Sequence, residues 1–244
     1  MRVVSWNIEL GLGVDRAIDA LATHPKLKDA DLVLLQEMDD VGTEQIARAL
    51  GLSFGYRAGC KHTDTGKPFG NAILARGDVG EATALRLPHL GRFMGMRRVA
   101  VNAVVSIPTM AGSDDRADAI EISVWSVHAE ISTLPHKQQV AQYRTIADHV
   151  IADRYPATIV GGDFNTASQR SIRGLVDNME RAGTRRVLDA GTHSFVRFGR
   201  PWELDHLFVA GLEVAANGVV RGHGASDHDP VWADLAPPTA IPPT

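Results

Sequence analysis

The fold of this chain is decided by residues 158–165, which read Thr-Ile-Val-Gly-Gly-Asp-Phe-Asn. The apolar, β-branched run Ala157–Val160 predicts a buried strand, and two glycines separate it from an acid and an amide. In α/β folds, residues that directly follow a strand line the ligand crevice, because the rigid sheet holds its edge loops in place. The stretch therefore predicts an α/β protein with functional groups at Asp163 and Asn165.

The same arrangement recurs at other expected strand ends. Asn7 follows Val-Val-Ser-Trp, Glu37 follows Leu-Val-Leu-Leu-Gln, and His128 follows Val-Trp-Ser-Val. Each residue alone could simply cap a helix or form a turn, but so many in one chain favour a site. Carboxylate and amide oxygens suit magnesium, manganese or calcium. The single cysteine, Cys60, excludes an intramolecular disulfide and a Cys-based zinc cluster, and we interpret it as an ordinary loop thiol.

The densest polar cluster of the chain is the segment 221–230, in which Asp227 and His228 are adjacent. A turn rich in turn-forming residues is the plainer interpretation of this segment. Asp205 interrupts an apolar strand pattern and is a candidate to hold His228 in one tautomer. A serine hydrolase built on Ser226 is disfavoured, because the chain has no Gly-x-Ser-x-Gly elbow.

The secondary-structure patterns favour one α/β domain over residues 1–236 and a Pro-rich flexible tail over residues 237–244. Helices are expected at Val14–Thr23, Thr43–Leu50, Pro135–Arg154 and Ser168–Ala182. Strands are expected at Arg2–Ile8, Asp31–Gln36, Asn71–Ala75, Arg98–Ile107, Ala119–His128, Ala157–Val160, Leu204–Ala210, Val214–Val220 and Val231–Leu235. Thr109–Arg116 is expected to be a hairpin loop. Strands adjacent in sequence alternate with strands separated by helices, which favours mixed sheets with helices outside.

Composition limits the classes of protein to consider. The chain has 244 residues, 44% hydrophobic and 22% charged, as in soluble globular proteins. We find no run of about 20 apolar residues, and we expect a cytoplasmic monomer. The net charge of −4 does not indicate nucleic-acid binding. The segment 169–200 nevertheless contains seven arginines against three acids, near Phe195, Phe198 and Trp202. These side chains could bind bases and phosphates, although arginines covering a helix face are the preferred explanation.

The motifs together resemble the endonuclease/exonuclease/phosphatase superfamily. They are Ser-Trp-Asn7-Ile, Leu-Gln-Glu37, Gly-Asn71-Ala-Ile-Leu, Ser-Val-His128, Gly-Gly-Asp163-Phe-Asn165-Thr, Leu-Asp205-His-Leu-Phe and Ser-Asp227-His228-Asp-Pro-Val. They run in the order of the family from residue 3 to residue 235. The resemblance implies an α/β (α+β) four-layer sandwich, in which two mixed β-sheets pack face to face and helices lie outside.

The resemblance also implies roles for the site residues. A divalent metal, Mg²⁺ or Mn²⁺, would be held mainly by Glu37, with Asn7 and Asp227 in or near its shell. Asp163 would orient or deprotonate the attacking water, and Asn165 would hold a phosphate oxygen. Asp205 would pair with His228, which would stabilise the developing charge. The remaining residues are His128, which would contact the phosphate or help the leaving group, and Asn71 and Arg98, which would be secondary supports.

One position departs from the family pattern. Many members carry a glutamate just before the residue that matches Arg98, and deoxyribonuclease-type enzymes use it to orient the histidine that matches His128. Here Met96 and Arg97 precede Arg98, so His128 is expected to lack that carboxylate. The resemblance implies hydrolysis of phosphoester bonds by a divalent-metal-dependent phosphodiesterase. Endonuclease and exonuclease are candidate activities within that class. The alternatives are a phosphatase acting on a small-molecule or lipid-headgroup phosphate, and a catalytically silent binding protein.

Overall fold

The computed structural model describes residues 1–91, 95–108, 119–131, 134–153 and 155–237. The expected hairpin loop at Thr109–Arg116 and residues 238–244 of the expected tail lie outside these ranges. No helix in the described ranges is both long and apolar enough to cross a membrane.

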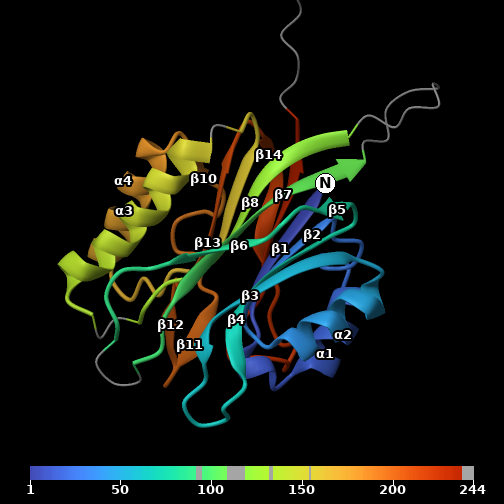
Figure 1. Ribbon diagram of the computed structural model, residues 1–244, viewed down its shortest axis with the longest axis horizontal. Helices are drawn as coiled ribbons and strands as arrows, with labels where there is room; N and C mark the ends of the chain where they lie inside the picture. The colour runs from blue at the N-terminus through green and yellow to red at the C-terminus, as the bar shows by residue number, and fades with distance from the viewer. Residues whose placement is uncertain (92–94, 109–118, 132–133, 154, 238–244) are drawn as a thin grey trace, which may run out of the picture.

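Two mixed sheets form the centre of the structure (Figure 1). The first has the order β14–β15–β1–β2–β4–β3, with bounds Glu213–Val219, Val231–Ala236, Arg2–Asn7, Leu32–Met38, Pro68–Ala75 and Ser53–Lys61. The second has the order β10–β13–β9–β8–β7–β5, with bounds Arg185–Arg186, Asp205–Ala210, Thr158–Asp163, Ala119–His128, Val99–Pro108 and Asp78–Val79. β6 (Thr83–Arg86) also pairs with β7. The strands β11 (Phe195–Arg197) and β12 (Arg200–Trp202) form a separate hairpin.

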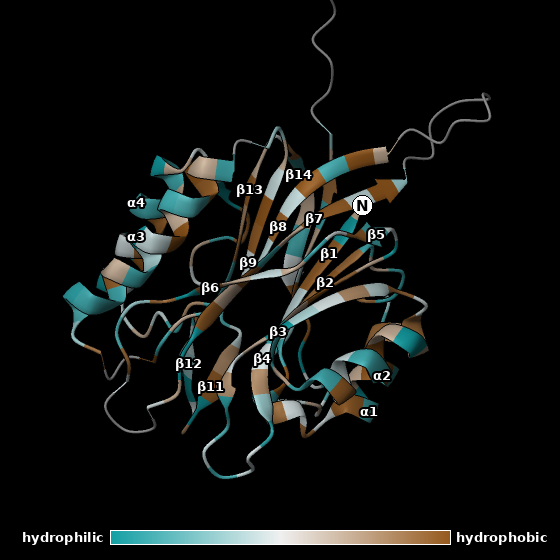
Figure 2. Ribbon diagram, viewed as in Figure 1, coloured by the Kyte–Doolittle hydropathy of each residue, from teal (hydrophilic) through white to brown (hydrophobic). Residues whose placement is uncertain are grey.

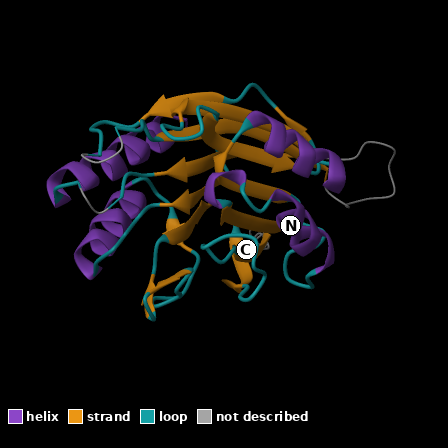
Figure 3. Cartoon of the chain, turned by 90° about the horizontal axis from the view of Figure 1, so that it is seen from below, coloured by secondary structure: helices purple, strands orange, loops and turns teal. Residues whose placement is uncertain are grey.

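Helices cover the outer faces of both sheets, which gives the four layers expected from the sequence (Figure 3). α1 (Val14–Thr23) and α2 (Asp40–Leu50) pack on the first sheet, and α3 (His136–Asp153) and α4 (Gln169–Arg181) pack on the second (Figure 1). A short 3₁₀ turn, Glu9–Gly11, follows β1.

Alternation along the strands explains this layering. On β2, Leu32 and Leu34 face the core between the two sheets, whereas Val33 and Leu35 pack beneath α1 and α2. Successive side chains of a strand point to opposite faces, so a strand buried on both faces is apolar throughout. Figure 2 accordingly shows strands that are largely hydrophobic between helices of mixed character.

The two glycines before Asp163 allow the close packing of β9. A Cβ on Gly161 would lie 2.7 Å from Cδ1 of Leu34 in the opposite sheet. Gly162 has φ +149°, and a Cβ there would lie 1.9 Å from the carbonyl oxygen of Val127 in the neighbouring strand. Both positions therefore require glycine, and the pair belongs to the strand itself rather than to a turn after it.

Truncating Leu34 tests this sheet-to-sheet core. Leu34→Ala is expected to lower the free energy of unfolding by about 2–5 kcal/mol, because a fully buried leucine is replaced by a cavity. Urea denaturation measures the change. Leu90→Ala is the matched control, since Leu90 is 43% exposed, and it should change stability by less than about 0.5 kcal/mol. Equal losses in the two variants would contradict the packing described here.

The expected elements match the observed ones, but the sequence patterns did not reveal β3. Residues 53–61 were not expected to form a strand, and Cys60 lies within β3 rather than in a loop. The side chains of this edge strand are largely exposed or half-buried, so it lacks the apolar run that marks the other long strands. The short strands β5, β6, β10, β11 and β12 were also missed, because two to four residues carry no periodicity.

Candidate active site

The site lies where parallel strands of both sheets end. β1 and β2 are parallel and end near Asn7 and Glu37, and β8 and β9 are parallel and end at His128 and Asp163. Parallel strands bring their carboxyl ends to the same edge. Asp205 begins the antiparallel strand β13, where it pairs in register with Asp163. The topology therefore gathers polar residues that are far apart in the sequence.

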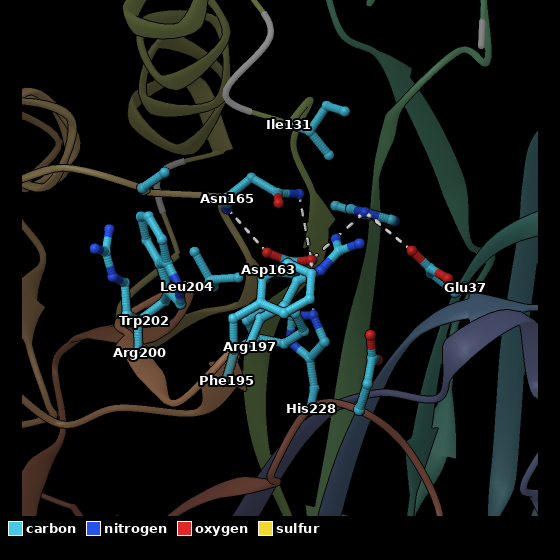
Figure 4. A pocket seen from close by; sticks show the side chains of 14 residues that line it. Glu37, Ile131, Asp163, Asn165, Phe195, Arg197, Arg200, Trp202, Leu204 and His228 are labelled. Atoms are coloured by element: carbon cyan, nitrogen blue, oxygen red, sulfur yellow. Dashed lines mark hydrogen bonds and ion pairs between the residues drawn. The ribbon is translucent and has the colours of Figure 1, made fainter. Parts of the chain in front are cut away.

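These side chains line a cleft of about 780 Å³ (Figure 4). Its lining residues include Glu37, His128, Asp163, Asn165, Asp227 and His228. The β11–β12 hairpin contributes the other wall, and Figure 4 shows Arg200 and Trp202 on the side of the cleft opposite Glu37. A pocket of this size is typical of ligand sites.

Asp163 is the buried centre of the cleft, with 2% exposure. Its Oδ1 accepts a hydrogen bond from the backbone N–H of Asn165 at 2.9 Å. Its Oδ2 accepts from Nδ2 of Asn7 at 3.0 Å and from Nδ2 of Asn165 at 3.3 Å. Asn165 has φ +52°, a left-handed conformation that asparagine tolerates better than most residues. The carboxylate is thus fixed in direction by two amides from different strand ends.

His228 and Asp205 form a second buried unit beside Asp163. Nδ1 of His228 donates to Oδ2 of Asp205 at 2.8 Å, and the Oγ–H of Ser194 donates to the same oxygen at 2.6 Å. Nε2 of His228 lies 3.8 Å from Oδ2 of Asp163. The ring of Phe195 packs on His228, with 4.8 Å between the centroids. These contacts hold the imidazole between two carboxylates.

The charge states follow from this arrangement. Burial alone would lower the pKa of His228, but the carboxylates of Asp205 and Asp163 outweigh it and raise that pKa to about 10. Burial raises the pKa of Asp163, an effect that His228 opposes and Asp205 reinforces. His228 is therefore a cation at neutral pH, and Asp163, whose pKa is raised to about 7, binds a proton more tightly than an ordinary aspartate.

His128 has a different environment, since Arg98 takes the place of an orienting carboxylate. Nη1 of Arg98 lies 3.1 Å from Nδ1 and 2.9 Å from Nε2 of His128. Its Nε2 lies 3.6 Å from a carboxylate oxygen of Glu37 and 3.6 Å from one of Asp163. Burial, Arg98 and His228 hold the pKa of His128 well below its usual range. His128 is therefore neutral.

Arg98 is held in turn by Glu130, which sequence reasoning missed. Oε1 of Glu130 lies 3.6 Å from Nε of Arg98, and the two side chains are 5% and 6% exposed. The carboxylate of Glu130 also accepts from the backbone N–H groups of Gly91 and Ile131. Glu130 follows His128 by two residues, but nothing in its spacing indicated a partner 32 residues earlier.

Glu9 interacts electrostatically with Asp227 and Glu37, two carboxylates of the cleft lining. The pKa of Glu9 is raised by burial and by the charges of Asp227 and Glu37. Glu37 sits at a β-bulge with φ +59° and uses Oε2 to accept from the N–H of Leu10 at 3.2 Å. Bulges commonly redirect a side chain next to an active site. Glu9 was not anticipated, although it follows Asn7 by two residues.

This acidic group fits a divalent cation. Glu9, Glu37 and Asp227 have hard oxygen ligands, and their mutual repulsion favours a positive charge among them. Asp163, Asp205 and His228 also offer ligand atoms within 4.8 Å of one another. Nδ1 of His228 is already hydrogen-bonded to Asp205, so we interpret that trio as a proton-binding relay. The Glu37 side of the cleft is the better metal candidate.

Asn71 lies outside the cleft lining. It is 1% exposed, and its Nδ2 donates to the carbonyl oxygens of Val99 at 2.9 Å and Ser126 at 3.0 Å. Asn71 is on β4 of the first sheet, whereas both acceptors are on strands of the second. Asn71 thus ties the sheets together beside the site. Arg98 likewise acts through His128 and Glu130 rather than from the cleft surface.

The fold is a sandwich of two mixed sheets with a polar, acidic cleft at the edge where both sheets end. A model of the Endonuclease/Exonuclease/phosphatase family matches residues 4–228, and the chain therefore belongs to this family. The family consists mostly of hydrolytic phosphoesterases, which generally use divalent metals. A UPF0294 protein of Vibrio vulnificus strain YJ016 is 33% identical over 103 residues, which are 41% of this chain and 36% of that protein. The match thus spans little more than a third of that relative.

Solved structures share the fold over nearly the whole chain. An endonuclease/exonuclease/phosphatase from Beutenbergia cavernae has a TM-score of 0.74 at 20% identity, covering 97% of this chain and 71% of that one. A mannosyl-6-phosphatase of Bacteroides thetaiotaomicron has a TM-score of 0.70 at 18% identity, covering 97% and 99%. D. rerio TDP2, solved with a single-strand DNA product, has a TM-score of 0.69 at 16% identity, covering 96% and 98%. At these identities the likeness concerns the fold alone.

Proposed function

We propose that the protein is a divalent-metal-dependent hydrolase of phosphoester bonds, acting as a phosphodiesterase. The observation that carries this proposal is the pairing of a fixed, buried Asp163 carboxylate with a protonated His228 in one cleft. Phosphoryl transfer needs positioned groups and compensated charge more than a covalent nucleophile. The cleft offers a base, a cation and an acidic group for a metal.

Asp163 is the residue that activates water in this proposal. Its two oxygens are held by Asn7 and Asn165, so its direction does not change as it accepts a proton. Burial raises its affinity for that proton, as suits a general base. Asn165 acts here by positioning Asp163, because its Nδ2 donates to Oδ2 of Asp163 and to the carbonyl oxygen of Ala129.

His228 stabilises the negative charge that develops on the phosphate. Asp205 and Ser194 keep its Nδ1 side occupied, and Nε2 faces Asp163 and the cleft. His128 is neutral, so it serves as a hydrogen-bonding group for the phosphate rather than as a strong acid.

Glu37, with Asn7, Asp227 and Glu9 nearby, would hold Mg²⁺ or Mn²⁺. A bound divalent ion supplies Lewis acidity and charge compensation at the phosphate. The β-bulge at Glu37 and the hydrogen bond from the N–H of Leu10 fix the direction of the Glu37 carboxylate.

Metal dependence is testable directly. EDTA should abolish hydrolysis of bis-p-nitrophenyl phosphate, and Mg²⁺ or Mn²⁺ should restore it, because the charge of the phosphate is otherwise uncompensated. Glu37→Gln should raise the metal concentration for half-maximal rate at least about tenfold, whereas the exposed Glu44→Gln serves as control. A metal-induced rise in melting temperature, absent from Glu37→Gln, gives a readout independent of turnover. Full activity in EDTA would contradict the proposal.

A comparison of a phosphodiester with a phosphomonoester substrate tests which class of ester the protein cleaves. The fold accommodates both a mannosyl-6-phosphatase and a protein that holds single-strand DNA product, so it does not choose between monoester and diester. The aromatic hairpin beside the cleft favours a phosphate with a group on each side. We therefore expect bis-p-nitrophenyl phosphate to be cleaved faster than p-nitrophenyl phosphate. The reverse order would favour the second candidate, a phosphatase of a small molecule or lipid headgroup.

A further inference from the structure

A continuous surface path leads away from the cleft. A second hollow, in front of the first turn of α4, shares Ala167 and Trp202 with the cleft wall. A third hollow, between α3 and α4, shares His136 and Arg170 with the second. Because neighbouring hollows share lining residues, the three hollows adjoin one another along the surface.

The hairpin at the start of this path presents one aromatic and cationic face. Residues opposite each other on antiparallel strands share a face, and the pairs are Phe195 with Trp202 and Arg197 with Arg200. All four side chains line the cleft. The arginine pair lies two residues beyond the aromatic pair, or about 7 Å at the rise of a strand. Phe198 at the tip is 91% exposed.

The groove between α3 and α4 at the other end is strongly basic. Four arginines line it, Arg144, Arg170, Arg173 and Arg181, against the single acid Asp177. Arg181 is paired with Asp148 at 2.7 Å. Among the residues that the structure describes, Arg144, Arg170 and Arg173 have no carboxylate partner in an ion pair. The chain as a whole has a net charge of −4, so this concentration of free cations is local.

We propose that a single-stranded nucleic acid runs from the catalytic cleft, across the β11–β12 hairpin, into the arginine groove between α3 and α4. This inference rests on the proposed function for the position of the cleaved phosphodiester. Aromatic side chains next to arginines bind unpaired bases and the phosphates between them. Cations spaced along α4 from Arg170 to Arg181, about 17 Å of helix, match a polyanion rather than one small phosphate.

Binding in EDTA tests the path without turnover. Fluorescein-labelled oligodeoxynucleotides of about 4 and about 12 nucleotides are titrated with the full chain, and the longer strand is expected to bind at least about tenfold more tightly. Arg144→Glu with Arg173→Glu should weaken binding of the longer strand at least about tenfold. It should also reduce the slope of log affinity against log salt by about two.

Two controls separate charge from structure. Arg16→Glu with Arg48→Glu makes the same charge change on exposed positions of α1 and α2, on the far flank of the molecule (Figure 1), and should bind the longer strand as the unaltered protein does. Arg144→Lys with Arg173→Lys keeps the charges and should retain most of the affinity. Circular dichroism and thermal melting establish that each double variant is folded.

Several results would overturn the inference. The first is equal affinity for the short and long strands. The second is equal weakening of binding by Arg16→Glu with Arg48→Glu, and the third is tighter binding of a duplex than of a single strand of the same length. The groove would be assigned to a lipid surface instead if the protein bound phosphatidylserine vesicles but not DNA. In that case Arg144→Glu with Arg173→Glu should abolish vesicle binding. Hydrolysis of bis-p-nitrophenyl phosphate is measured separately, so failure of the proposed function and failure of the path are distinguishable.

Discussion

Asp163→Asn is expected to lower the turnover of a phosphodiester by about a thousandfold in the presence of Mg²⁺. Asparagine nearly preserves the shape of the side chain, so its oxygen can still accept from the N–H of Asn165. What it loses is the ability to take a proton from water, and general bases contribute about 10²–10⁴-fold to enzymatic rates. Steady-state rates on bis-p-nitrophenyl phosphate measure the loss.

The stability of this variant separates chemistry from folding. Burial raises the pKa of Asp163, which means that the buried charge destabilises the folded state in the absence of metal. Neutral asparagine should therefore leave the melting temperature unchanged or higher. The exposed Asp177→Asn is the matched control and should keep normal turnover of the small diester. A turnover in Asp163→Asn close to that of the unaltered protein would refute a base at this position.

His228→Ala is expected to lower turnover by about 10²–10³-fold, because it removes a preorganised cation from the position where phosphate charge develops. Exposed His149→Ala on α3 is the control. Retention of full turnover in His228→Ala would contradict the proposed charge stabilisation. Asp205→Asn should produce a smaller loss, since the imidazole remains in place.

The pH profile gives His228 a second, independent readout. Its folded pKa, about 10, exceeds the ordinary value of 6.5, so the protonated ring contributes stability that is fully present below pH 6.5. That contribution is lost as the pH rises through about 10. Asp205 is the largest upward influence on this pKa, so Asp205→Asn should move the alkaline loss of both stability and activity to lower pH. An unmoved alkaline limb would show that another group governs it.

The sequence predicts the position of site residues best where an apolar strand leads directly to a polar residue. Asn7, Glu37, His128 and Asp163 all occupy such ends, and the structure brings them into or beside one cleft. Their chemical roles stay predictions, as do the cytoplasmic location, the monomeric state and the domain limits.

Sequence reasoning failed where function depends on pairing between distant segments. Glu130 acquires its importance from Arg98, which directly precedes β7, whereas Glu130 follows β8. The hairpin at 195–202 has two three-residue strands interrupted by glycine and proline, so no periodicity marks it. Its aromatic and arginine residues were recognised, but which of them share a face depends on a register that only the structure supplies.

The site straddles the boundary between the two sheets. Asn7 and Glu37 come from the first sheet, and Asp163 from the second, and the bond from Asn7 to Asp163 crosses between them. A ligand that contacts residues of both sheets binds only when the sheets are packed together, so its binding free energy stabilises that packing. By the same linkage, a saturating ligand is expected to offset part of the stability that Leu34→Ala removes. Ligand binding at the cleft and cohesion of the sandwich are thus coupled through the residues at the boundary between the sheets.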